Sequence, residues 1–368
     1  MTHPLVYHHT GKVLPNYART TLRKVSKNWS GPVIILNNAI NPIDVPGVTD
    51  EKFETWYDPE VFQNVAKDFG MDSDFRDGFW LHAFERFFIL LQWMDRENIK
   101  RFLHAELDVV LFGGAEVLSR LDSLREGLFL PRASTIQAGA NWLYVNQRAS
   151  LNALVEYFSA HAGEGYEMQL LGRFLKDMPD LAFSVPSHQF FEVADSSSRG
   201  VNELSLDQVR GVIDIHPIGT WLFGQDRRNI PKQPVFNRFY FDDVGSPIMN
   251  SLRFGFSWGS RFPTVRDIRD NSGTWPVFAL HVHSKVMRRA HSSMMLALHA
   301  WLANRNFRTI IIPQSTFRYA YSRVRLCVDL AYSAFRFGFF REWLEKKLRK
   351  ILRQPDGTAS SSSIPPRP

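Results

Sequence analysis

The sequence predicts an α/β protein with a mixed, mostly parallel central sheet flanked by helices. Apolar strand-like runs alternate with amphipathic helical runs through the first half of the chain, which is the pattern of such folds. The chain has 368 residues, 44% of them apolar, and can therefore bury one large core or two modest ones.

The opening of the chain predicts a parallel arrangement. Residues 5–9, LVYHH, form a short strand, and the helical run 14–29 is entered through Pro15. GPVIILNN, residues 31–38, is a second buried strand that two asparagines close. A β-α-β opening of this kind is typical of parallel strands.

A long apolar helix and a further strand come next. Residues 79–99 carry aromatic and aliphatic side chains around most of the helix, so we expect it to be largely buried. FLHAELDVVLF lies within the strand-like run 100–112, which leads through Gly113 and Gly114 into the amphipathic helix 115–125.

The alternation continues to about residue 187. The expected strands are 127–131, 141–147 and 182–187, and the expected helices are 149–163 and 167–178. Residues from about 190 to 280 are richer in Gly, Pro, Asn and aromatics, as in loops that wrap a site.

Charge divides the chain into parts. The segment Lys285–Arg353 holds 15 basic and 3 acidic residues, a balance of +12 within a total of +7. We expect an α/β domain over 1–290, a basic, aromatic helical extension over 291–353 and a disordered tail over 354–368. The extension either lies on an anionic membrane or packs on the domain with a solvated basic face.

Several classes of protein are excluded. The single Cys327 rules out an internal disulfide framework and a cysteine-based zinc site. We find no signal-peptide segment, no stretch long enough to span a bilayer and no nucleic-acid-binding motif. We expect a cytoplasmic protein, soluble or peripheral on the cytoplasmic face of a membrane.

Two carboxylates interrupt the apolar run around residue 107. On a strand, Glu106 and Asp108 would point to the same face, because side chains alternate with period two. Paired carboxylates repel unless a cation lies between them, and hard oxygen ligands suit Mn²⁺ or Mg²⁺. An acidic-x-acidic triplet is also common without a metal, and Asp72-x-Asp74 is one we leave unassigned.

A second cluster lies in FALHVHSK, residues 278–285. His281 and His283 share one face of a strand-like run, and Lys285 follows at its exit. The two histidines are either metal ligands or ordinary core and surface residues. Lys285 could neutralise a phosphate as a point charge. Together with the acidic pair, these residues suggest a metal-bridged diphosphate.

With these motifs, the sequence resembles nucleotide-sugar-dependent glycosyltransferases of the GT-A fold, in particular bacterial enzymes of surface-polysaccharide synthesis. The resemblance extends over about residues 5–290. FLHAELDVVLF after a long helix looks like their D-x-D or E-x-D motif, LHVHSK like their C-terminal motif, and HHTGKVLPNYARTTL like their opening. DIHPIGTWLFGQDRRN, residues 214–229, looks like a further family segment. It matches at Asp214, Ile218, Gly219, Leu222, Gly224, Asp226, Arg228 and Asn229.

The resemblance implies a site and its ligands. A UDP- or GDP-linked sugar would be the donor, and a glycan or a lipid-linked molecule the acceptor. Residues implied to contact the donor are His8, His9, Thr10, Arg86, Glu106, Lys285, Asp226 and Asn229. Residues implied to hold Mn²⁺ or Mg²⁺ are Glu106, Asp108, His281 and His283. His216-Pro217 and Arg227 depart from the family pattern.

Three of these predictions have alternatives. Asp214 ranks first as a catalytic carboxylate, followed by Glu167, which could instead complement a helix dipole, and Glu164. Arg86 could contact the donor or pair with Glu85 or Asp95 on its helix. Alternatives for the whole chain are a metal-dependent hydrolase built on His104-x-Glu106 and a non-catalytic peripheral membrane protein.

Overall fold

The computed structural model describes residues 2–70, 78–134, 136–187, 202–216, 218–219, 254–258, 263–267, 273–282, 285 and 287–291. The chain divides into two units, 1–309 and 310–368, and every described residue belongs to the first. The predicted extension 291–353, apart from its first residue, and the tail 354–368 lie outside the described residues.

An eight-stranded sheet organises the described part of the chain, with the order β3-β2-β1-β4-β8-β6-β7 and β9 beside β6. Its strands are β1 (Leu5–His9), β2 (Val33–Asn37), β3 (Thr49–Lys52), β4 (Phe102–Ala105), β6 (Leu128–Ser134), β7 (Gln137–Ala138), β8 (Trp142–Val145) and β9 (Ala182–Val185). Strands β3, β2, β1 and β4 are parallel, β9 is parallel to β6, and β8 is antiparallel to both β4 and β6. The predicted α/β class with a mixed, mostly parallel sheet is confirmed.

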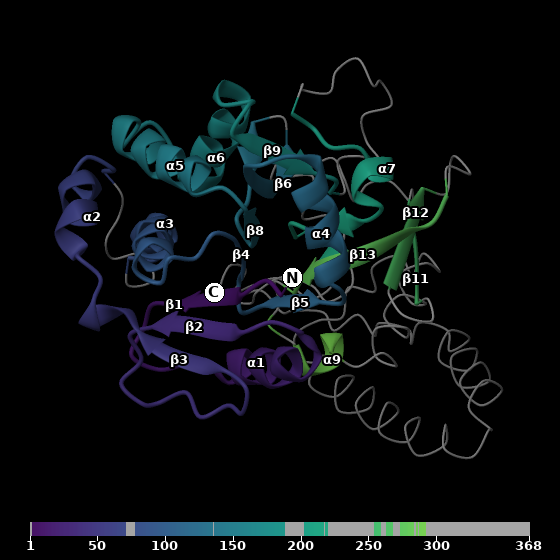
Figure 1. The fold of residues 1–368 in the computed structure, drawn as a ribbon, viewed down its shortest axis with the longest axis horizontal. Helices are drawn as coiled ribbons and strands as arrows, with labels where there is room; N and C mark the ends of the chain where they lie inside the picture. Colours follow the sequence, from purple (N-terminus) through teal and green to yellow (C-terminus); the bar gives the residue numbers. More distant parts are fainter. Residues whose placement is uncertain are drawn as a thin grey trace, which may run out of the picture. The chain divides into compact units, whose positions relative to one another are not determined.

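Helices cover both faces of this sheet. The helices are α1 (Asn16–Asn28), η1 (Phe53–Thr55), α2 (Pro59–Ala66), α3 (Phe79–Arg96), α4 (Ala115–Leu124), α5 (Arg148–Ala160), α6 (Glu167–Asp177), α7 (Leu206–Val209) and α9 (Met287–Ala290). Residues of α3, α5 and α6 form one apolar core with one face of the sheet, and residues of α1 and α4 form a second core with the other face (Figure 1). Side chains of β4 alternate between the two cores, as strand geometry requires.

A second sheet of five strands continues from the first. Its order is β10 (Val212–Ile213), β13 (Trp275–His281), β12 (Pro263–Asp267) and β11 (Phe254–Trp258), with β5 (Val109–Leu111) beside β13. The sequence predicted one strand over 100–112 and loops over 190–280. Instead, the run 100–112 is split between the two sheets, and the loop-like region supplies short strands. Strands β10, β11 and β12, of two to five residues, are too short to carry a clear period-two signal, whereas the end of β13 lies in the run 278–285 that the sequence marked as strand-like.

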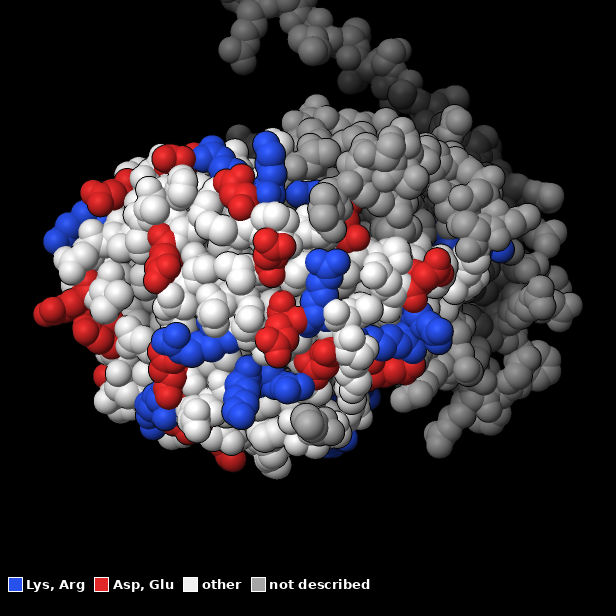
Figure 2. Space-filling view, turned by 45° about the horizontal axis from the view of Figure 1, so that its top comes forward, with Lys and Arg blue, Asp and Glu red and all other residues white. Residues whose placement is uncertain are grey.

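The described surface is mixed in charge. On the face that Figure 2 shows, lysines and arginines are interspersed with aspartates and glutamates. This agrees with the sequence, because residues 1–284 hold 28 basic and 33 acidic residues. None of the described helices combines the length and the apolar character that crossing a membrane requires.

Candidate functional site

The site lies at the carboxyl ends of two parallel strands, β1 and β4. From β1 the chain passes through α1 to β2 and on to β3, and it then returns through α3 to β4 on the other side of β1. The strand order therefore reverses between β1 and β4. Open α/β sheets bind ligands at such a switch point, outside the carboxyl ends of the strands.

A turn after β4 presents the acidic pair. Glu106 donates its backbone N–H to the carbonyl of Asn141 at 2.9 Å, and the N–H of Val109 donates to the carbonyl of Glu106 at 3.0 Å. The first bond continues the pairing of β4 with β8 by one residue, and the second closes a turn that directs the chain into β5. The prediction that both carboxylates share one strand face is therefore wrong, because a turn rather than strand alternation brings them together.

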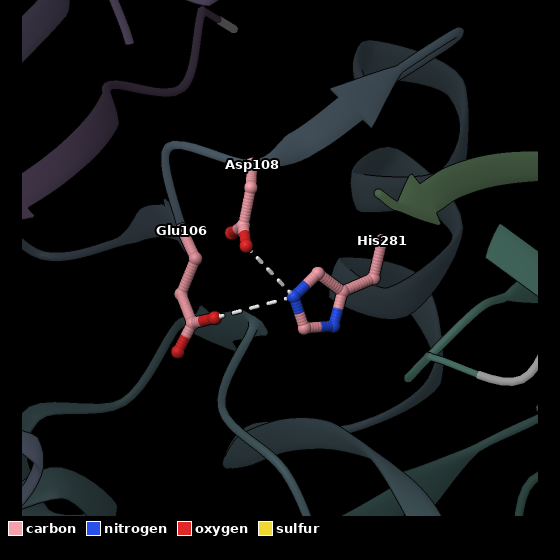
Figure 3. Close-up of side chains that lie close together, drawn as sticks. All are labelled: Glu106, Asp108 and His281. Atoms are coloured by element: carbon pink, nitrogen blue, oxygen red, sulfur yellow. Dashed lines mark hydrogen bonds and ion pairs between the residues drawn. The ribbon is translucent and has the colours of Figure 1, made fainter. Parts of the chain in front are cut away.

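Strand pairing brings a histidine to this turn. Strand β13 is antiparallel to β5, and His281 lies opposite Val109. Figure 3 shows the His281 ring pointing between the two carboxylates. Its Nε2 is 3.1 Å from Oδ2 of Asp108 and 3.7 Å from Oε2 of Glu106. One ligand atom from each of these three residues lies within 4.8 Å of the other two.

The other ring nitrogen of His281 is held by the main chain. Nδ1 lies 2.5 Å from the carbonyl oxygen of Ile215, and because a carbonyl only accepts, Nδ1 carries the hydrogen. In the neutral imidazole, the lone pair of Nε2 then faces Glu106 and Asp108. Metal-binding histidines are oriented in this way, and a set of two carboxylate oxygens and one imidazole suits Mn²⁺ or Mg²⁺. The donor set fits such an ion.

Lys285 reaches the same turn from beyond β13. Its ammonium forms an ion pair with Oδ2 of Asp108 and lies 5.7 Å from the ring centre of Tyr17. Its backbone adopts φ 61°, a left-handed conformation that non-glycine residues seldom take. The structure therefore places Lys285 beside the acidic pair, as the sequence predicted.

Arg86 on α3 connects Glu106 to a second carboxylate. It forms ion pairs with Glu106 and with Glu167, the first residue of α6. Burial alone would raise the pKa of Glu106, but the positive charges of Arg86 and its other neighbours lower it to about 2. Burial raises the pKa of Glu167, and Arg86 opposes this rise. The sequence left open that Arg86 pairs with Glu85 or Asp95 on its own helix, but its ion pairs are with Glu106 and Glu167.

Asp214 is fully buried, and main-chain groups surround its carboxylate. Oδ1 accepts the N–H of Ile218 at 3.0 Å, and Oδ2 accepts those of Gly219 at 2.8 Å and His281 at 3.2 Å. Burial raises its pKa to about 6, against the lowering effect of these N–H groups. These contacts tie the Asp214 carboxylate to the strand end that carries His281, and its catalytic role stays a prediction.

The predicted residues of β1 lie beside the switch point. Nε2 of His8 is 3.2 Å from the Thr10 hydroxyl oxygen. Burial, followed by the nearby His104 and Arg86, holds the pKa of His8 well below its usual range. His9 donates from Nε2 to the carbonyl of Val13 at 3.2 Å. Three other predicted contacts, His283, Asp226 and Asn229, lie outside the described residues.

Two structural contributors at this site were not among the residues predicted for a glycosyltransferase, although His104 belonged to the hydrolase alternative. Asn141 fixes the segment after β10 by donating its side-chain N–H to the carbonyl of Asp214 at 3.0 Å. His104 is buried on β4 and donates from Nδ1 to the carbonyl of Val6 at 3.1 Å. The spacing of Phe102, His104 and Glu106 along one face could have pointed to His104, whereas no sequence signal marks Asn141.

No family model and no curated protein matches this chain. Among solved structures, it is similar to mouse xyloside xylosyltransferase 1, with a TM-score of 0.37 and 10% identity over 51% of this chain and 86% of that one. A second is galactosyltransferase LgtC in complex with donor and acceptor sugar analogs. Its TM-score is 0.39, and it is 10% identical over 85% of this chain and 98% of that one. A third is glycosyltransferase GlyE of Streptococcus pneumoniae TIGR4. Its TM-score is 0.33, and it is 16% identical over 50% of this chain and 45% of that one.

Proposed function

We propose that this chain is a metal-dependent glycosyltransferase. It would move a sugar from a nucleoside-diphosphate sugar to a glycan or a lipid-linked acceptor, in the synthesis of a cell-surface polysaccharide. The observation that carries the proposal is the convergence of Glu106, Asp108 and His281 at the switch point of the sheet. The resemblance of the E-x-D segment and the LHVHSK segment, which contain these three residues, to GT-A enzymes also supports it.

Each residue of the cluster has a defined part in this function. Glu106, Asp108 and His281 would hold Mn²⁺ or Mg²⁺, and when bound the ion would offset the negative charge that develops on the departing diphosphate. Lys285 would contribute a second positive charge at the same place. His8 and Thr10, at the end of β1, would face the nucleoside side of the donor, since they lie at the switch point.

The test is metal and nucleotide binding by Asp108→Asn. Asparagine keeps the shape of aspartate but removes the charge, so we expect Mn²⁺ binding to be lost, together with any Mn²⁺-dependent thermal stabilisation by UDP or GDP. Removal of the metal with EDTA should have the same effect on the wild type. Electron paramagnetic resonance of free Mn²⁺ and thermal melting measure these effects, and a panel of nucleotide sugars then reports donor hydrolysis.

The matched control is Asp44→Asn, because Asp44 is exposed and lies outside the cluster. We expect this variant to bind Mn²⁺ as the wild type does. Mn²⁺ binding by Asp108→Asn with wild-type affinity would contradict the proposed metal centre.

We also propose that the basic, aromatic extension 291–353 holds the enzyme on an anionic membrane surface. The extension makes up most of the segment Lys285–Arg353, whose balance is +12, and each lysine or arginine near such a surface contributes about 1 kcal/mol. A lipid-linked acceptor would make this contact useful.

A further inference from the structure

Arg86 joins two carboxylates that come from different parts of the chain. Its side chain is 8% exposed, and Nη1 lies 2.5 Å from Oε1 of Glu106. Nη2 forms an ion pair with Oε1 of Glu167, whose side chain is 7% exposed. Glu106 is 31% exposed, so the row of three charges runs from the protein interior to the candidate site.

The two oxygens of Glu106 have different partners. Oε1 accepts from Arg86, whereas Oε2 faces Nε2 of His281 at 3.7 Å. Arg86 therefore fixes the rotation of the carboxylate that turns Oε2 toward His281 and Asp108. From this geometry we infer that Arg86 and Glu167 are positioning residues for Glu106. This inference rests on the proposed function, in which Glu106 is a metal ligand.

Charge explains why a second carboxylate is present. Arg86 alone would neutralise Glu106, and a carboxylate paired only with a cation attracts a metal ion less strongly. Glu167 balances Arg86, so that the three groups together carry one negative charge when all are ionised. The negative charge of Glu106 then remains effective toward an ion at the site.

Neighbouring groups fix the positions of Arg86 and Glu167. The guanidinium carbon of Arg86 lies 5.1 Å from the ring centre of Phe87. The first turn of α6 is fixed by Gln169, whose side chain accepts the N–H of Tyr166 at 3.3 Å. A planar guanidinium can contact both carboxylates at once through its two terminal nitrogens, which a lysine ammonium cannot reproduce in the same plane.

The experiment titrates the metal-free full-length chain with Mn²⁺ and follows the free ion by electron paramagnetic resonance. We expect Glu167→Gln and Arg86→Lys each to weaken Mn²⁺ binding by about 10- to 100-fold, the usual effect of losing a group that orients a metal ligand. The loss of Mn²⁺-binding free energy in the double variant should be smaller than the sum of the losses in the two single variants, because both residues act on Glu106 through one network.

The controls are Glu116→Gln and Arg120→Lys on α4, an ion pair at 2.7 Å that is more exposed than Arg86–Glu167. Both should bind Mn²⁺ as the wild type does. Thermal melting of the metal-free variants checks that they fold. If a single variant does not fold, the double variant Arg86→Gln/Glu167→Gln replaces it. This double variant removes both charges, so no buried charge is left without its partner.

The outcomes separate this inference from the proposed function. A folded Glu167→Gln that binds Mn²⁺ with wild-type affinity overturns the positioning role and leaves the metal centre intact. A wild-type chain that does not bind Mn²⁺ overturns the metal centre itself and the inference with it.

Discussion

His281 contributes to the candidate site through both of its ring nitrogens. Nδ1 donates to the carbonyl of Ile215, and this bond aims Nε2 at the carboxylates of Glu106 and Asp108. Hydrogen bonds of this kind fix both the tautomer and the ring orientation of a metal-binding histidine. The main chain after β10 is therefore part of the candidate site.

The buried position of His104 leads us to expect that the protein loses stability in acid. Burial, followed by the charge of Arg86, lowers its pKa from 6.5 to about 3. Between these values the unfolded chain binds a proton that the folded chain does not, so the free energy of unfolding falls as the pH drops below 6.5. From pH 6.5 to 5 this amounts to about 2 kcal/mol.

His104→Gln should reduce that dependence, because glutamine can still donate to the carbonyl of Val6 but does not titrate. Urea unfolding at pH 6.5 and pH 5 measures the difference between this variant and the wild type. Equal acid sensitivity of His104→Gln and the wild type would show that His104 does not titrate as its burial predicts.

At the scale of elements, close contact between the 214–219 segment and the end of β13 holds the imidazole in place. A Cβ added at Gly219 would lie 1.8 Å from the carbonyl oxygen of His281. Because this neighbour is backbone at the end of a paired strand, it cannot move aside at low cost. Gly219 is thus required by the packing of the two segments.

Gly219→Ala should therefore displace the end of β13 and weaken Mn²⁺ binding, with a stability cost of about 1–3 kcal/mol from overpacking. Mn²⁺ titration and thermal melting measure the two effects. Gly114→Ala is the matched control, since its Cβ would lie 1.8 Å from the ring of Trp29. It should lower the melting temperature but keep wild-type Mn²⁺ affinity, whereas an equal loss of affinity in both variants would mean that Gly219 acts only through stability.

The strongly periodic elements could be predicted from the sequence. The strand at residues 5–9 and the helix beginning at Glu167 agree with β1 and α6, because apolar spacing alone specifies them. Strands β10, β11 and β12 were not predicted, because each has only two to five residues and carries little period-two signal, and the partner of β10 is also distant in sequence. The same limit applies to the site: residue type pointed to Glu106, Asp108 and His281, but the burial of Asp214 depends on contacts that no local pattern contains.

At the scale of the whole molecule, strands β5 and β13 connect the two sheets. Strand β5 follows the turn that ends β4 of the first sheet, and β13 pairs with it in the second. The cluster of three ligands lies at this connection, with two members from one side and one from the other. Binding an ion there would stabilise the folded chain against unfolding, by about 2.7 kcal/mol at a metal concentration 100 times the Kd.

The basic segment Lys285–Arg353 predicts salt-sensitive binding to anionic vesicles. Full-length protein should co-sediment with vesicles containing phosphatidylserine at low ionic strength and dissociate as salt screens the charges. Vesicles of phosphatidylcholine alone are the control. A chain lacking residues 315–368 should bind less, and unchanged binding by that chain would contradict the proposed membrane contact.

The separation of the ligands along the chain has a consequence during synthesis. Asp108 and His281 are 173 residues apart. At the usual speed of translation, about 5–20 residues per second, the imidazole leaves the ribosome roughly 10–35 seconds after the carboxylates. A nascent chain therefore carries only part of the proposed ligand set until β13 has been synthesised.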